Sequence, residues 1–181
     1  MTERIIIAGA GGQGIMLLGR ILANAAMREN KYVIYLPSYG AEVRGGTAHC
    51  SVIISDSEIS SPYIAWADSL IIMNQPSIER FKARLKNKGL FIINRSLATK
   101  EIERNTHPLK YPFTDMAIKL GNIKAANMVA LGCYLAQKKI INPKTILKVI
   151  EEIAPSKKKG LMEINQRAFA EGLKLKEQFG L

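Results

Sequence analysis

A strand, a glycine-rich loop and a helix follow one another in the first 27 residues, and this order restricts the fold more than any other feature. Residues 5–8 form an apolar run, and glycines occupy positions 9, 11, 12 and 14 of the loop that follows. Apolar residues then recur at helical spacing, at Ile15, Leu18, Leu22, Ala25 and Ala26. The pattern predicts a short buried strand that passes through a tight turn into an amphipathic helix.

The loop has the composition of an anion-binding turn. Gly9, Gly11 and Gly14 fit G-x-G-x-x-G, and Gly12 removes one more side chain. Glycine permits positive φ angles and lets a phosphate approach the backbone. The first N–H groups of the following helix are unpaired and carry partial positive charge. A tight turn without a ligand would show the same glycines, so the loop alone leaves both interpretations open.

The segment after this helix argues against a nicotinamide dinucleotide as the ligand. Dinucleotide-binding domains place an Asp or Glu about 20 residues beyond the glycines, at the end of the second strand. Here the expected strand at 32–36 continues into Pro37, Ser38 and Tyr39. Glu29 precedes the strand and Glu42 follows it in the next loop. The pattern G-x-x-x-x-G-K-[ST] is also missing, which argues against a P-loop NTPase.

A second glycine-rich loop, residues 38–47, contains the single arginine Arg44 with Gly40, Gly45 and Gly46 around it. Ligands of parallel sheets bind beyond the carboxyl ends of the strands. If the strands that precede the two loops are adjacent, both loops face one crevice, and the Arg44 guanidinium is suited to gripping a phosphate. The alternative for Arg44 is a surface arginine paired with Glu42 or another acid.

The rest of the chain predicts one α/β domain, residues 1–181, with a Rossmann-like, mostly parallel sheet, flanking helices and a helical C-terminal portion. Further strands are expected at 48–55, 69–73 and 90–94. One helix is expected to begin at Ser61-Pro62, and a second to span 76–86 and end before Gly89. A third is expected to run from a Thr114 cap to Gly121, and a fourth, buried, to span 124–139. A fifth is expected to begin at Asn142-Pro143, and a last helix follows it near the C-terminus.

Charge is distributed unevenly between the two halves of the sequence. Residues 1–78 hold 5 Lys and Arg against 6 Asp and Glu, whereas residues 79–181 hold 21 against 9. This basic half predicts an acidic partner. Its cations are scattered along expected helices without interleaved aromatic residues, so nucleic acid is not expected. With no signal peptide and no apolar run of about 20 residues, we expect a cytoplasmic protein without a membrane span.

The cysteine and histidine content argues against a metal centre held by this chain. Cys50 and Cys133 are too few to hold an iron–sulfur cluster, and His49 and His107 form no ligand cluster with them. Both cysteines lie among apolar residues. We therefore expect buried, reduced thiols and no metal site.

The two loops taken together resemble the gamma subunit of 2-oxoacid:ferredoxin oxidoreductases. The resemblance rests on GAGGQGIMLLGRILANAA, SYGAEVRGGTAHCSVIISDSEI and ADSLIIMN, and it extends over essentially the whole chain. The motif SYG-E-RGG is most similar to that of the 2-oxoglutarate type. Gamma subunits of the pyruvate, 2-oxoisovalerate and indolepyruvate types remain alternatives.

The resemblance implies an enzyme that converts a 2-oxoacid, coenzyme A and oxidised ferredoxin into acyl-CoA, carbon dioxide and reduced ferredoxin. Thiamine diphosphate with Mg and the iron–sulfur clusters are then expected on the alpha, beta and delta partner subunits. The gamma subunit is associated with coenzyme A and with assembly of the complex. By itself the chain is expected to be inactive and to contribute no catalytic residue.

Residues that match the family pattern are the candidate coenzyme A site: Gly9, Gly11, Gly12, Gln13, Gly14, Tyr39, Arg44, Gly45 and Gly46, with Gly40 and Glu42 in the same motif. In this hypothesis Gly11, Gly12 and Gly14 let the ligand approach the backbone. Gln13 orders the loop or touches the ligand, and Arg44 contacts phosphate or a neighbouring subunit. Two rival interpretations remain. One is a stand-alone NAD- or FAD-dependent oxidoreductase, and the other is an interaction module whose glycine loops pack on partner subunits.

Overall fold

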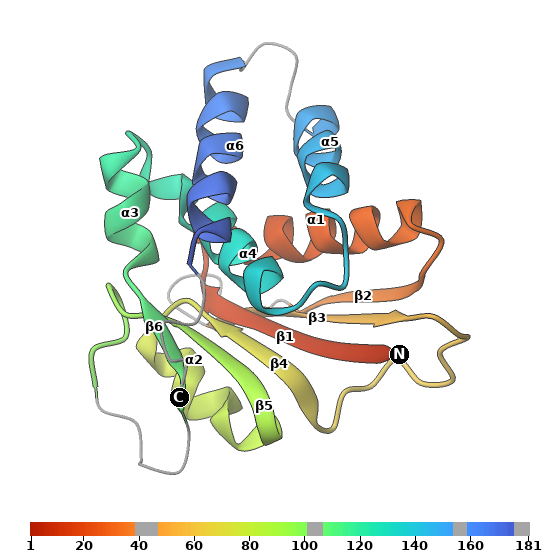
Figure 1. Ribbon diagram of the computed structural model, residues 1–181. Helices are drawn as coiled ribbons and strands as arrows, with labels where there is room; N and C mark the ends of the chain where they lie inside the picture. Colours follow the sequence, from red (N-terminus) through yellow and green to blue (C-terminus); the bar gives the residue numbers. More distant parts are fainter. Residues whose placement is uncertain (39–46, 101–106, 154–158, 176–181) are drawn as a thin grey trace.

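A computed structural model describes residues 1–38, 47–100, 107–153 and 159–175, and these form a six-stranded sheet covered by helices (Figure 1). The strand order is β2-β3-β1-β4-β5-β6. The strands are β1 (Thr2–Ala10), β2 (Tyr32–Ser38), β3 (Thr47–Ser55), β4 (Ala67–Ile72), β5 (Leu85–Asn94) and β6 (Leu109–Tyr111). Strands β1, β4, β5 and β6 pair in parallel, whereas β3 is antiparallel to both β1 and β2. The expected α/β fold is confirmed.

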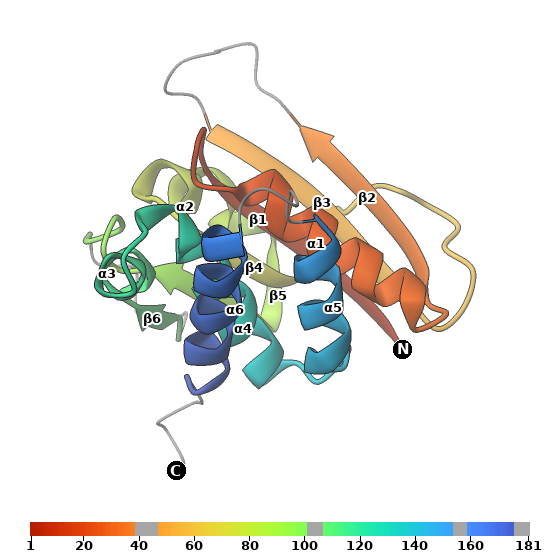
Figure 2. The same ribbon diagram turned by 90° about the horizontal axis from the view of Figure 1, so that it is seen from above.

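Helices cover the two faces of the sheet unequally. They are α1 (Ile15–Arg28), α2 (Gln75–Phe81), α3 (Phe113–Lys119), α4 (Ala126–Gln137), α5 (Pro143–Ile153) and α6 (Lys159–Leu173). Figure 1 shows α2 on one side of the sheet and the other helices on the opposite side. Seen from above, α1 runs along β1 and β3, and α3 lies near β6 (Figure 2).

Strand β1 is apolar along its centre because both of its faces are buried. Ile5 and Ile7 belong to the core beneath α1 and α4, while Ile6 and Ala8 belong to the core on the α2 side. All four residues have no exposed surface. Continuous apolar strands of this kind are typical of a sheet that is covered on both sides.

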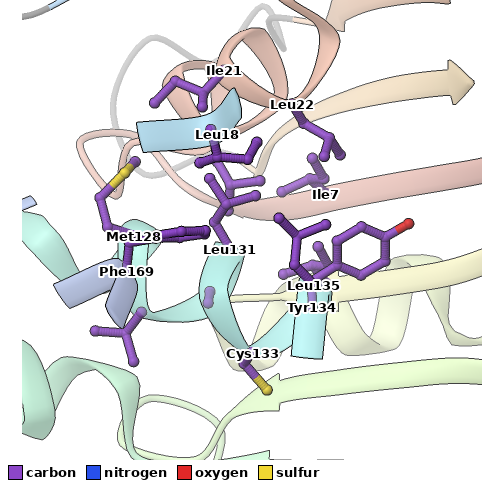
Figure 3. Close-up of a cluster of buried hydrophobic side chains, with 14 of the residues drawn as sticks. Ile7, Leu18, Ile21, Leu22, Met128, Leu131, Cys133, Tyr134, Leu135 and Phe169 are labelled. Atoms are coloured by element: carbon purple, nitrogen blue, oxygen red, sulfur yellow. The ribbon is translucent and has the colours of Figure 1, made fainter. Parts of the chain in front are cut away.

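Helix α4 is the centre of the larger core. Its residues 126–135 are all buried, which confirms the prediction of a buried helix in this part of the chain. In Figure 3 the side chain of Met128 lies beside Phe169 of α6, and that of Leu131 lies beside Leu18 of α1. A helix that is buried on all sides is stabilised by packing rather than by a polar face.

Helices α4 and α6 approach each other closely at two glycines. A Cβ built on Gly132 would overlap the backbone carbonyl oxygen of Phe169, and one built on Gly172 would overlap that of Val129. Backbone cannot move aside as a flexible side chain does. This crossing therefore requires the absence of a side chain at both positions.

A buried carboxylate joins α4 to the sheet. Glu3 on β1 is 5% exposed and accepts hydrogen bonds from Ser69 Oγ at 2.6 Å and from the Tyr134 hydroxyl at 3.5 Å. Its second oxygen pairs with Lys138 Nζ at 3.3 Å. The charge is thus paired and hydrogen-bonded, as a buried carboxylate requires.

Three local predictions were wrong. No helix opens at Ser61-Pro62, although the Ser61 hydroxyl accepts the Tyr63 N–H as an N-cap side chain would. The helix expected at 76–86 is shorter: α2 ends at Phe81, a 3-10 turn follows at Lys82–Arg84, and β5 already begins at Leu85.

The third concerns Thr114, which does not cap its helix. Helix α3 begins one residue earlier, with Pro112 at the N-cap position. The Thr114 side chain instead accepts a hydrogen bond from the Asn94 amide at 2.8 Å. In contrast, Asn142 caps α5 as expected, because its side-chain oxygen accepts the Lys144 N–H at 2.9 Å.

Candidate functional site

The candidate site lies at the edge of the sheet where β1, β4, β5 and β6 end. The glycine loop leaves β1 at this edge and leads directly into α1. Strand β2 also ends here, because it runs in the same direction as β1, but β3 lies between the two. The strands before the two glycine loops are therefore not adjacent, and two inter-strand spacings, about 10 Å, separate them.

The tip of the glycine loop is open to solvent. Gly11 and Gly12 are exposed, and a Cβ built on either would have no atom within 4 Å. Gly12 and Gly14 have φ angles of 86° and 72°, in the left-handed region that side chains disfavour. The backbone at Gly11 and Gly12 is accordingly accessible to a bulky anion.

The Gln13 side chain folds back and fixes this loop. Its Oε1 accepts the Ala10 N–H at 2.6 Å, and its Nε2 donates to the Met73 carbonyl at 3.1 Å. Gly9 makes the arrangement possible, because a Cβ there would lie 2.5 Å from Gln13 Oε1 and 2.9 Å from Met73 Cβ. Of the two roles considered for Gln13, ordering the loop is the one that these contacts support.

Buried amides continue this hydrogen-bond network along the sheet edge. The Met73 carbonyl also accepts from Asn94 Nδ2 at 3.3 Å, and Asn94 exchanges further bonds with Thr114 at the start of α3. Asn94 has no exposed surface. The ends of β1, β4 and β5 are thereby held together beneath the loop.

No side chain caps the N-terminus of α1. Its N-cap is Gly14, and its first turn contains no acidic residue. The first N–H groups of a helix have no partner within the helix, so they favour an anion. Helix α2, at the same edge, differs because the Asn74 side chain accepts the Ser77 N–H at 3.2 Å.

Sequence reasoning missed Asn127, as it missed Met73 and Asn94. Asn127, in the first turn of α4, donates from Nδ2 to the Gly14 carbonyl at 3.1 Å. A Cβ on Gly14 would overlap the Asn127 side chain, so this glycine serves packing against α4 as well as backbone conformation. The sequence feature that could have indicated Asn127 is a single amide side chain at the start of a helix that is otherwise mostly apolar.

The second glycine loop is not described. Tyr39, Gly40, Glu42, Arg44, Gly45 and Gly46 all lie outside the described residues, so their roles stay predictions. His49, which follows this loop on β3, packs against the Phe81 ring with centroids 4.8 Å apart. Burial, together with Arg80 and Arg84, lowers the pKa of His49 and favours its neutral form.

Both cysteines are buried thiols. Cys50 and Cys133 are fully buried, and burial raises the pKa of each thiol to about 12. Within the described parts of the chain, no three His, Cys, Asp or Glu side chains gather as metal ligands. No helix in those parts is long and apolar enough to cross a membrane. The expectation that this chain holds no metal stays a prediction.

Comparison with known proteins gives consistent matches. Residues 4–175 match the family described as pyruvate ferredoxin/flavodoxin oxidoreductase. The 2-oxoglutarate synthase subunit KorC of Methanocaldococcus jannaschii is 34% identical over 98% of this chain and 96% of its own length. The ketoisovalerate oxidoreductase subunit VorA of Methanothermobacter marburgensis is 35% identical over 74% of this chain, which spans only 28% of VorA.

Solved structures show the same fold. The gamma subunit of a keto/oxoacid ferredoxin oxidoreductase from Geobacter sulfurreducens superposes with a TM-score of 0.82 at 30% identity, over 95% of this chain and 96% of that one. The 2-oxoglutarate:ferredoxin oxidoreductase of Magnetococcus marinus, solved with 2-oxoglutarate, coenzyme A and succinyl-CoA bound, gives 0.87 at 24% identity. That match covers 99% of this chain and 32% of the larger one.

Proposed function

The chain belongs to the pyruvate ferredoxin/flavodoxin oxidoreductase family, and we propose that it serves as the gamma subunit of a 2-oxoglutarate:ferredoxin oxidoreductase. The enzyme would convert a 2-oxoacid, coenzyme A and oxidised ferredoxin into acyl-CoA, carbon dioxide and reduced ferredoxin. Alpha, beta and delta subunits would complete it, and ferredoxin would dock on the assembled complex. Thiamine diphosphate, Mg and the iron–sulfur clusters would reside on those partners.

Within that enzyme, the glycine loop would bind a phosphate-bearing part of coenzyme A as substrate. The observation that carries this proposal is the uncapped N-terminus of α1 behind the open backbone of Gly11 and Gly12. Coenzyme A bears a pyrophosphate and a 3′-phosphate, and the helix dipole with its unpaired N–H groups favours such anions. Arg44 would add a charge-assisted contact from the second loop.

The polar groups around the loop are suited to positioning rather than to proton transfer. Gln13, Asn94 and Asn127 are amides that cannot titrate, and Thr114 is engaged by Asn94. In this proposal carbon–carbon bond cleavage would take place on the partner subunits, which would carry the thiamine diphosphate. This chain would hold the acyl acceptor in reach of them.

The KorC relatives support 2-oxoglutarate as the 2-oxoacid, and subunits of two other types also match. VorA and a pyruvate synthase subunit PorC from Methanothermobacter thermautotrophicus also match, the latter at 26% identity over 82% of this chain. The complex purified with this chain would be assayed with 2-oxoglutarate, pyruvate and 2-oxoisovalerate. A higher kcat/KM for 2-oxoglutarate supports the proposal. A higher kcat/KM for pyruvate or 2-oxoisovalerate would show that the enzyme is of that type instead.

Substitution at Gly11 tests the coenzyme A role. In the assembled enzyme, Gly11→Val places a branched side chain in open space where the phosphate must approach, without strain from a positive φ. We expect a raised KM for coenzyme A and unchanged exchange of carbon dioxide with the 2-oxoacid. Gly160→Ala, which is also in open space but remote on α6, is the control. If Gly11→Val instead lowers the yield of assembled enzyme, and the enzyme that does assemble has a normal KM for coenzyme A, the interaction-module alternative is favoured.

A further inference from the structure

Asn127 is a buried polar residue that the proposed function does not yet explain. It is 1% exposed and lies in a helix whose other buried residues are almost all apolar. Burying an amide costs free energy unless its polar atoms are hydrogen-bonded. A residue of this type in the middle of the core therefore calls for a specific partner.

That partner is the residue at which α1 begins. Asn127 Nδ2 donates to the Gly14 carbonyl at 3.1 Å, and the same carbonyl accepts the Leu18 N–H at 3.0 Å. The Oδ1 atom of Asn127 is buried and accepts no hydrogen bond from any described residue. The Asn127 amide thus makes one hydrogen bond, to a residue 113 positions away in the sequence. This bond holds Gly14, the N-cap residue of α1, in place.

The contact also fixes the direction of the first turn of α1. The Gly14 carbonyl points along the helix, where it accepts the Leu18 N–H, and the free first-turn N–H groups point the opposite way, out of the helix end. Gly14 itself is held against Asn127 so closely that a Cβ would overlap the amide, which limits the movement of the loop.

We propose that Asn127 is a positioning residue for the acyl acceptor: it fixes the Gly14 carbonyl, so that the first-turn N–H groups of α1 stay aimed at a phosphate of coenzyme A. This inference rests on the proposed function of the loop. It predicts a role in substrate affinity rather than in the rate of the chemical steps. It also predicts that the role depends on the phosphates of the acceptor.

The test compares coenzyme A with pantetheine, an acyl acceptor that has the same thiol and no phosphate, in the assembled enzyme. Asn127→Leu preserves the shape and removes the donor. We expect a three- to tenfold higher KM for coenzyme A, kcat within twofold of the unsubstituted enzyme, and an unchanged KM for pantetheine. Asn127→Asp, which replaces the amide donor by a carboxyl group, should raise the KM for coenzyme A more than tenfold.

The matched control is Asn122→Ala. Asn122 lies one turn earlier and caps the 3-10 turn Ile123–Ala125 before α4, with its side chain accepting the Lys124 N–H at 2.9 Å. Its loss should leave the KM for both acceptors unchanged. If Asn127→Leu fails to assemble, Asn127→Ala, which leaves space instead of bulk, is measured in the same way.

The outcomes separate the two proposals. If the unsubstituted enzyme binds pantetheine as well as coenzyme A, the phosphate role of the loop is wrong. If it prefers coenzyme A but Asn127→Leu leaves both KM values unchanged, the positioning role alone is wrong. Equal increases for both acceptors, or a lower kcat with normal KM, would assign Asn127 to the general structure of the core and also overturn the inference.

Discussion

Gln13 Nε2 lies 3.1 Å from the carbonyl oxygen of Met73, so the glycine loop after β1 is tied to the end of the neighbouring parallel strand β4. The Met73 N–H in turn donates to the Ala8 carbonyl at 2.8 Å. The loop is thus shaped by its own strand and by the next one, before any ligand is bound. Such preorganisation lowers the entropy that a ligand must remove on binding.

Replacing Gln13 should therefore weaken coenzyme A binding without unfolding the domain. Gln13→Ala removes two hydrogen bonds from the loop, and we expect the KM for coenzyme A in the assembled enzyme to rise about fivefold, or about 1 kcal/mol. Gln137→Ala is the control, because its amide bonds the Leu175 carbonyl far from the loop. An unchanged KM in Gln13→Ala would mean that the loop keeps its shape without this side chain.

Arg44→Ala should reduce coenzyme A affinity about ten- to a hundredfold, the loss expected for one charge-assisted contact of roughly 1.5–3 kcal/mol. Carbon dioxide exchange, which precedes acyl transfer, should be largely spared. Arg28→Ala serves as the comparison, because Arg28 lies at the opposite end of α1 and pairs with Glu152 at the surface. Equal affinity in the two variants would remove Arg44 from the phosphate site.

Gly172→Ala should destabilise the chain by about 2–3 kcal/mol, because the new methyl group meets the α4 backbone. The measurement is thermal or denaturant unfolding. Gly160→Ala, in the same helix but in open space, should be neutral or stabilising by up to about 1 kcal/mol. If Gly172→Ala were as stable as Gly160→Ala, the close crossing would not limit the size of residue 172.

The two thiols should be unreactive in the folded chain. With a pKa of about 12 and no exposed surface, Cys50 and Cys133 should not react with a disulfide reagent at pH 8 within minutes. Both should react fully in denaturant. The chain purified alone should also be colourless. A brown preparation with stoichiometric iron, or one rapid thiol in the native state, would contradict this description.

Association with the partner subunits should weaken as salt rises, since charges on exposed side chains are screened within about 8–10 Å at physiological ionic strength. The basic half of the chain presents exposed lysines on α3, α5 and the segments that flank α4: Lys119, Lys124, Lys139, Lys144 and Lys148. The measurement is the fraction of complex retained at increasing salt. A flat response would indicate an apolar interface.

The first strand, its loop and α1 could be predicted because their signals are local. The apolar run, the glycines and the helical spacing from Ile15 to Ala26 all lie within one short segment, and each favours the same structure. The same holds for Asn142, whose capping role needs only the next two residues. Buried helix α4 was likewise evident from its continuous apolar composition.

Other features could not be predicted because they depend on distant residues. Strand β3 enters the sheet between β1 and β2, and strand order is not encoded in the alternation of a single strand. Asn127 meets Gly14 across the fold, so its role was not visible from sequence spacing. Strand β5 begins earlier than predicted, and its pairing with β4 is irregular between Ala67 and Ser69. Lys88, within β5, has a φ of 62°, which the sequence pattern did not predict.

Strand β2 stands at the end of the sheet, and this has a consequence for the chain before it is fully folded. Residues 32–36 read Tyr-Val-Ile-Tyr-Leu, an uncharged segment of high β-propensity that can pair with copies of itself and nucleate aggregates. Lys31 precedes it and Pro37, which lacks an N–H, interrupts it. We expect these flanking residues to act as gatekeepers against strand-to-strand aggregation, and replacing Pro37 would remove one of them.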